Sequence, residues 1–307
     1  MNEDKLKNND SIQKNTLSIF QIAVMTTICV ASLRTFPPMA EEGRASILMY
    51  IIPAILFLIP TSLVSAEFAT TYKGGIYVWI REAFGNRMGF VAIWLQWIQN
   101  VVWYPVQLAF VAAALAFTIN RGDLSNSGLF TAVVIIVVYW LSTFLAFKGG
   151  NLFAKVSSIG GMIGVLIPGA ILIILGLLWM AQGQPISESY LQSSYIPKIT
   201  GISSLVLIVS NVLSYAGMEM NAVHAGQMEN PKKDFTKAIA LAFILILCVF
   251  IFPTLAIAIA IPADKLGMAN GIMVAFQEFF EKFQPRKHQI ESVLQKNRSA
   301  LHRCLGK

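Results

Sequence analysis

A glycine and an acidic side chain lie close together inside a long apolar stretch. Residues 201–228 are mostly apolar and long enough to cross a bilayer, but near their middle the sequence reads Ser-Tyr-Ala-Gly-Met-Glu from Ser214 to Glu219. Glycine weakens a helix, and a carboxylate at bilayer depth is energetically costly. We therefore expect the backbone to open at Gly217 and to bind a ligand. The alternative is that Glu219 is a structural hydrogen-bonding partner of a neighbouring helix.

A second apolar stretch, 16–38, carries Arg34 followed by the adjacent Pro37 and Pro38. Proline removes a backbone donor and disfavours helix in the residue before it, so this stretch is expected to unwind or kink toward its outer half. Two discontinuous spans are the sequence pattern of transporters built from inverted repeats, in which freed N–H and C=O groups bind substrate near the midplane. A helix N-terminus also attracts a carboxylate, which suits an amino acid.

The composition requires a membrane around these two segments. The 307 residues are 56% hydrophobic and 13% charged, and the mean hydropathy is +0.64, values that exclude a water-soluble domain with an ordinary surface. Seven stretches have the length of roughly 20 residues that a membrane helix needs. They are 16–38, 47–69, 88–118, 129–147, 156–180, 201–228 and 236–261. The sequence thus predicts an all-α integral membrane protein of about seven helices, with spans one and six discontinuous.

Basic residues are distributed unevenly between the loops. With the N-terminus inside, the cytoplasmic side holds Lys5, Lys7, Lys14, Lys73, Arg81, Arg87, Lys148, Lys155, Lys232, Lys233 and Lys237. The opposite side, up to the last span, holds only Arg44, Arg121, Lys198 and Lys265. The positive-inside rule therefore predicts a cytoplasmic N-terminus. It also accounts for the net charge of +7 without nucleic acid as a partner.

Aromatic and amide side chains crowd the third predicted span. Trp97, Asn100 and Tyr104 are spaced so that one helical face can present all three. The wall of a substrate cavity and an ordinary packing face are both open interpretations.

Enzymatic chemistry has no motif in this chain. Cys29, Cys248 and Cys304 do not cluster, and no phosphate-binding glycine loop, HExxH, GxSxG or CxxC occurs. We expect no metal site, no cofactor and no enzymatic activity.

Three motifs, in order along the chain, resemble the amino acid/polyamine/organocation (APC) superfamily of permeases. They are the segment from Ala66 to Gly85 after the second span, the interrupted Tyr215-Ala216-Gly217-Met218-Glu219, and Gln227-Met228-Glu229-Asn230-Pro231-Lys232-Lys233-Asp234. Within the superfamily the chain is most similar to the bacterial glutamate:GABA antiporters. That likeness rests on Ser214-Tyr215-x-Gly217-x-Glu219, His224, Glu229-x-x-Lys232 and Gly89-Phe90-x-Ala92-Ile93. The resemblance covers 16–284.

The resemblance implies a LeuT-like inverted-repeat fold in a bacterial inner membrane and an amino acid as the small-molecule substrate. It implies that the substrate's carboxylate and amino groups bind to the backbone at Val30, Ala31, Ser32, Leu33, Tyr215, Ala216, Gly217 and Met218. Trp97 would line the cavity, and Glu219 would gate it or sense protons. Arg34, Asn100 and His224 are three further candidate site residues. Arg34 is expected to reach the outer interface along its stem, with a substrate-carboxylate role as the alternative. His224 is expected to pack, with pH sensing as the alternative.

The family pattern is incomplete in this chain. We expect a cytoplasmic N-terminus at 1–15, an APC-type membrane domain at 16–285 and an aberrant basic tail at 286–307. The domain would hold a first repeat at 16–180, a partial second repeat at 201–261 and an external loop segment at 262–285. Because alternating access needs both repeats, the polypeptide alone is expected to be a truncated, inactive form unless a second chain or an oligomer completes it.

Two functions compete with glutamate:GABA exchange. One is a permease for another amino acid or a polyamine. The other is a membrane scaffold that uses its helices for assembly without transport.

Overall fold

The computed structural model describes residues 17–72, 75–148, 156, 159–197, 202–267 and 270–283, and these form helices and loops without any strand. The predicted segments 1–15 and 286–307 lie outside the described residues. Five stretches are long and apolar enough to cross a membrane: Ala45–Thr71, Asn86–Thr118, Gly128–Phe147, Ile159–Ala181 and Pro231–Ala260. A sixth is the pair Ile19–Val30 and Leu33–Glu41, bent by 50°. The predicted all-α membrane protein is confirmed.

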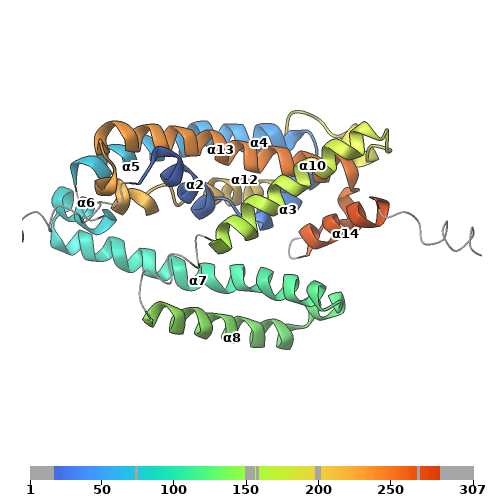
Figure 1. Ribbon diagram of the computed structural model, residues 1–307, viewed down its shortest axis with the longest axis horizontal. Helices are drawn as coiled ribbons and strands as arrows, with labels where there is room; N and C mark the ends of the chain where they lie inside the picture. The colour runs from blue at the N-terminus through green and yellow to red at the C-terminus, as the bar shows by residue number, and fades with distance from the viewer. Residues whose placement is uncertain are drawn as a thin grey trace, which may run out of the picture.

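The first, second and seventh predicted spans pack together as one bundle. It contains α2 (Ile19–Val30), α4 (Ala45–Pro53), α5 (Ile59–Thr71) and α13 (Pro231–Ala260). Figure 1 shows α13 running along α4 and α5, with α2 and α12 (Ile202–Ser214) beside it. Pro53 ends α4, and a π-helical turn (Ala54–Leu58) follows it, which is the usual adjustment when proline removes a hydrogen bond from a continuing helix.

A buried aromatic cluster holds this bundle together. The rings of Tyr50 on α4 and Phe250 on α13 are stacked with centroids 5.4 Å apart, and Tyr215 meets Phe250 edge-on at 5.3 Å. The Tyr50 hydroxyl lies 3.1 Å from Thr254 Oγ1, and the Tyr215 hydroxyl donates to the Tyr50 carbonyl at 3.0 Å. The cluster therefore fixes the residue that follows α12 onto both α4 and α13.

The helix α10 (Ile167–Ala181) also packs against α13. A Cβ at Gly176 would overlap the Cβ of Ala256, so the absent side chain permits the two helices to approach closely. The short helix α11 (Glu188–Gln192) follows α10 in the chain. The amphipathic helix α14 (Gly271–Phe283) covers the end of α10, where Phe279 meets Trp179 with ring centroids 5.7 Å apart.

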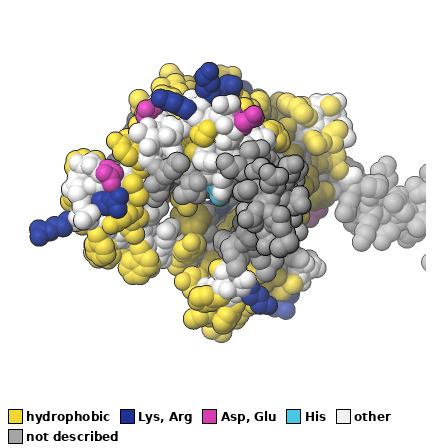
Figure 2. All heavy atoms as spheres, turned by 60° about the vertical axis from the view of Figure 1, so that its left-hand side comes forward, with side chains coloured by type: hydrophobic (Ala, Val, Ile, Leu, Met, Phe, Trp, Pro, Cys, Tyr) yellow, Lys and Arg dark blue, Asp and Glu magenta, His cyan; other side chains and the backbone are white. Residues whose placement is uncertain are grey.

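Three further helices pack on one another beside the bundle. The helices α6 (Gly75–Phe84) and α7 (Asn86–Thr118) pack on each other, and α8 (Gly128–Phe147) packs on α7 (Figure 1). Most apolar side chains of α7 and α8 are exposed. Figure 2 shows hydrophobic side chains over much of the visible surface, with Lys and Arg toward its margins. Such a surface is suited to lipid.

The sixth predicted span, 201–228, is not one membrane-crossing helix. The helix α12 has 13 residues, which gives a length of about 20 Å, and it ends at Ser214. A turn and a 3₁₀ helix, η5 (Met220–Gln227), complete the segment. The predicted discontinuity in span six is thus observed, and it is wide enough that α12 alone is too short to cross the bilayer.

Candidate functional site

The first break separates α2 from the short helix α3 (Phe36–Glu41). Ala31 and Ser32 are extended, with φ and ψ of −71° and 132° and of −137° and 127°, and the 3₁₀ helix η1 (Leu33–Thr35) follows them. The Thr35 hydroxyl donates to the Ser32 carbonyl at 2.8 Å. A helix end leaves carbonyls without intrahelical partners, and a helix start leaves N–H groups without them. The break therefore leaves carbonyl acceptors before Ala31 and N–H donors after Ser32.

The second break follows α12 and depends on Gly217. Its φ of +115° lies in a region that side-chain-bearing residues rarely adopt, so the chain turns here as the sequence predicts. The Gly217 N–H donates to Glu219 Oε2 at 3.2 Å. Glu219 also precedes the first residue of η5. The described contact of this carboxylate is thus a local one, to a backbone donor of the break itself.

The two breaks face each other. A Cβ on Gly217 would lie 3.6 Å from the Cys29 carbonyl oxygen and 3.6 Å from Val30 Cγ2. Asn221, which is buried, donates to Thr26 Oγ1 at 3.1 Å. These contacts fasten η5 to α2 just before the first break, so the two irregular segments form one local structure.

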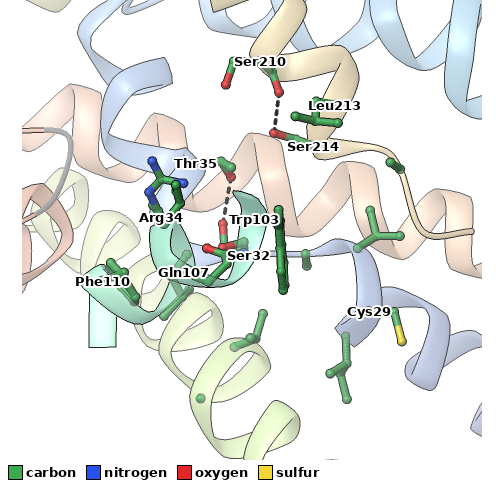
Figure 3. Close-up of a pocket in the computed structure, with 18 of the residues that line it drawn as sticks. Cys29, Ser32, Arg34, Thr35, Trp103, Gln107, Phe110, Ser210, Leu213 and Ser214 are labelled. Atoms are coloured by element: carbon green, nitrogen blue, oxygen red, sulfur yellow. Dashed lines mark hydrogen bonds between the residues drawn. The ribbon is translucent and has the colours of Figure 1, made fainter. Parts of the chain in front are cut away.

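A cavity of about 590 Å³ opens beside the first break. Its lining comes from α2 and η1, from α7, from the π-helical turn Met162–Leu166 and from α12. In Figure 3, Trp103 and Gln107 lie across the space from Ser210 and Ser214, with Ser32 and Arg34 between the two helices. Arg34 is the one charged side chain among the described lining residues. A concave, mostly apolar site with a few polar groups is the usual form of a small-molecule site.

The predicted site residues divide into those that line this cavity and those that do not. Val30, Ala31, Ser32, Leu33, Arg34 and Ala216 line it. Tyr215, Gly217 and Met218 belong to the second break but do not line the cavity, and the side chains of Tyr215 and Met218 are fully buried.

The remaining predicted residues lie elsewhere. Trp97 is 61% exposed and lies outside the cavity, as does Asn100. Glu219 is half-buried at the second break, and His224 Nδ1 lies 3.3 Å from Gln227 Oε1.

The side of α7 that faces the cavity is not among the predicted site residues. Gln99, Trp103 and Gln107 line it, together with Phe110. Their four-residue spacing places these three side chains on one helical face. The sequence signal for this face is a pair of glutamines around a tryptophan within an apolar span. The predicted face with Trp97, Asn100 and Tyr104 is rotated away from the cavity.

Metal binding has no support in the part of the chain that the structure describes. No group of three or more His, Cys, Asp or Glu side chains lies close enough together there to hold an ion.

Residues 17–290 match the family described as amino acid permease. "Uncharacterized transporter lpg1691" of Legionella pneumophila is 40% identical over 272 residues, which are 88% of this chain and 58% of that protein. The glutamate/gamma-aminobutyrate antiporter of Lactococcus lactis subsp. cremoris is 28% identical over 89% of this chain and 55% of its own length. The probable agmatine/putrescine antiporter AguD of Lactococcus lactis subsp. lactis is 28% identical over 86% and 56%. The chain thus spans a little over half the length of these relatives.

Proposed function

Because the chain belongs to the amino acid permease family, we propose that it binds an amino acid at the two facing breaks, as the substrate of exchange of the glutamate:GABA type. The observation that carries this proposal is the contact of Gly217 with Cys29 and Val30, which brings two irregular backbone segments together beside a cavity. An extended stretch between helix ends leaves backbone groups available to a ligand at low cost.

The polarity of the first break supports a zwitterionic ligand. The C-terminal end of α2 carries free carbonyls and a partial negative charge, which favour an ammonium group. At the start of η1, Ser32 provides no side-chain cap, which leaves backbone N–H groups for a carboxylate. Ala31 and Ser32 separate the two ends, so an amino acid lying along them would satisfy both.

Glu219 has a role that follows from its contact with Gly217. Its carboxylate accepts the Gly217 N–H in the ligand-free structure. A substrate carboxylate reaching the second break would compete for the same donor and displace Glu219. We therefore assign Glu219 a gating role, in which the binding of substrate is coupled to movement of the residues between Gly217 and η5.

Two alternatives differ in measurable ways. One relative is a probable agmatine/putrescine antiporter, so a cationic polyamine is the second candidate substrate. A membrane scaffold without transport is the third candidate function. It predicts that no small amine or amino acid changes the thermal stability of the protein.

Equilibrium binding to the purified full chain in detergent tests the proposal. Radiolabelled glutamate should bind saturably, unlabelled GABA should displace all of it, and both should raise the unfolding temperature. Glu219→Gln should change the affinity for glutamate more than that for GABA, since Glu219 accepts the Gly217 N–H that the α-carboxylate of glutamate would use and GABA has no α-carboxylate. Saturable binding of putrescine without competition by glutamate would establish the polyamine alternative. Absence of any ligand-dependent thermal shift, together with a stably copurifying membrane partner, would establish the scaffold.

A further inference from the structure

Arg34 occupies an unusual position in this membrane protein. It lines the main cavity and also a smaller one of about 170 Å³ next to it. Among the described residues it forms no ion pair with a carboxylate, and it is the one charged residue in either lining. A charge within a membrane span is costly and is generally paired or solvated. The guanidinium is therefore available to an anionic ligand.

The smaller cavity has a polar wall of its own. Thr35, Ser210, Asn211 and Ser214 line it beside Arg34. Asn211 is only 2% exposed; its Nδ2 donates to the Met49 carbonyl, and its Oδ1 has no hydrogen-bond partner within the described part of the chain. Because the amide nitrogen is committed to Met49, the oxygen remains a buried acceptor without a described partner. A buried acceptor of this kind indicates an ordered water behind this wall.

The shared members of the two linings show that the cavities are neighbours. Arg34, Thr35, Ser210 and Ser214 belong to both. Figure 3 shows Arg34 and Thr35 on one side of this boundary and the two serines of α12 on the other. A ligand whose charged groups lie against Ala31 and Ser32 can therefore extend its other end past Arg34.

Glutamate and GABA have one feature in common that fits this arrangement. In both, a chain of three carbon atoms separates an ammonium group from a carboxylate, which is the side-chain carboxylate in glutamate. Putrescine carries a second ammonium at that end, and glutamine carries a neutral amide. A planar guanidinium binds a carboxylate through two parallel hydrogen bonds and repels an ammonium.

We infer that Arg34 is the specificity residue of this site and binds the carboxylate that glutamate and GABA share, so that cationic polyamines are excluded. The inference rests on the proposed function and adds the charge class of the substrate to it. Arg34 determines the charge of the ligand that binds. The polar wall of the smaller cavity, which includes Asn211, surrounds the end of the ligand nearest Arg34. A charge-assisted contact of this kind changes affinity by about 10- to 150-fold.

The test compares dissociation constants for glutamate, glutamine and putrescine in the purified full chain. In the unmodified protein, glutamate should bind at least about tenfold more tightly than glutamine, and putrescine more weakly than either. Arg34→Gln should lower glutamate affinity by about 10- to 150-fold while leaving glutamine within about threefold. Arg34→Lys should keep the preference for glutamate at reduced affinity. The ratio of two ligands within one variant is independent of the fraction of protein that is folded.

Arg44→Gln is the matched control. Arg44 lies outside both cavities, with its guanidinium carbon 5.1 Å and 5.4 Å from the ring centroids of Tyr190 and Tyr195. This variant should leave the ratio of glutamate to glutamine affinity unchanged. An unchanged ratio in Arg34→Gln, or putrescine as the tightest ligand of the unmodified protein, would overturn the inference. Binding of no amino acid at all would instead overturn the proposed function itself.

Discussion

Gly217→Ala tests the conformation on which the second break depends. The residue has a φ of +115°, and an added Cβ would lie 3.6 Å from its nearest neighbours, the Cys29 carbonyl oxygen and Val30 Cγ2. Distances of this length are ordinary van der Waals contacts. The predicted cost is therefore conformational and not steric, on the order of 1–3 kcal/mol for a side-chain-bearing residue held in a sparsely populated backbone region.

This cost appears either in the free energy of unfolding or in the affinity for glutamate. If the break keeps its shape, the free energy of unfolding in an SDS titration falls by about 1–3 kcal/mol. If the break relaxes to a common conformation, stability is retained, and glutamate affinity falls by about 5- to 150-fold because the backbone groups no longer face the first break. Both quantities are measured on the same preparation, and the prediction is that at least one of them falls.

Gly226→Ala is the control for this experiment. Gly226 lies in η5, only nine residues further along, with an ordinary φ and no described heavy atom within 4 Å of its added Cβ. It should change neither quantity appreciably. If Gly217→Ala leaves both stability and affinity unchanged, or if Gly226→Ala produces an equal loss, the reasoning about the second break is refuted.

Three further experiments probe how the breaks and the helices around them are held. Tyr215→Phe removes the hydroxyl that donates to the Tyr50 carbonyl, which still accepts the Ala54 N–H, so the unfolding free energy should fall by about 0.5–1.5 kcal/mol in an SDS titration. A double-mutant cycle of Asn221→Ala and Thr26→Ala should give a coupling energy of about 0.5–1.5 kcal/mol, whereas a value near zero would mean that this hydrogen bond does not fasten η5 to α2. Gly176→Leu should separate α10 from α13 and broaden the gel-filtration peak, and a sharp peak with unchanged stability would contradict the close packing there.

The second break could be predicted from sequence because its cause is local: Gly217 releases the backbone in the turn that follows Ser214. The stretch 16–38 is broken as predicted, but Pro37 and Pro38 lie in the first turn of α3, where proline fits a helix start, and the break itself is at Ala31 and Ser32. Hydrophobic length likewise predicted the spans that are single helices, since one membrane thickness sets them all.

The cavity wall on α7 could not be assigned in the same way. Aromatic side chains lie on two opposite faces of this helix, so periodicity alone leaves its rotation undetermined. The face with Trp103 is selected by the contact of α7 with distant segments, including the first break, which only the fold supplies. The hydrogen bond of Asn221 to Thr26 joins residues 195 positions apart, so it too depends on the fold and not on the local sequence.

The central claim is that the paired breaks form an amino-acid site, and Cys29 offers a direct measurement of it. This thiol lines the main cavity beside the first break, whereas Cys248 lies in α13 outside both cavities and serves as an internal reference. The rate of maleimide labelling at each cysteine is followed by mass spectrometry with and without ligand. Saturating glutamate or GABA should slow labelling of Cys29 severalfold and leave Cys248 unchanged. Equal rates at Cys29 with and without both ligands, in protein that remains folded, would contradict the claim.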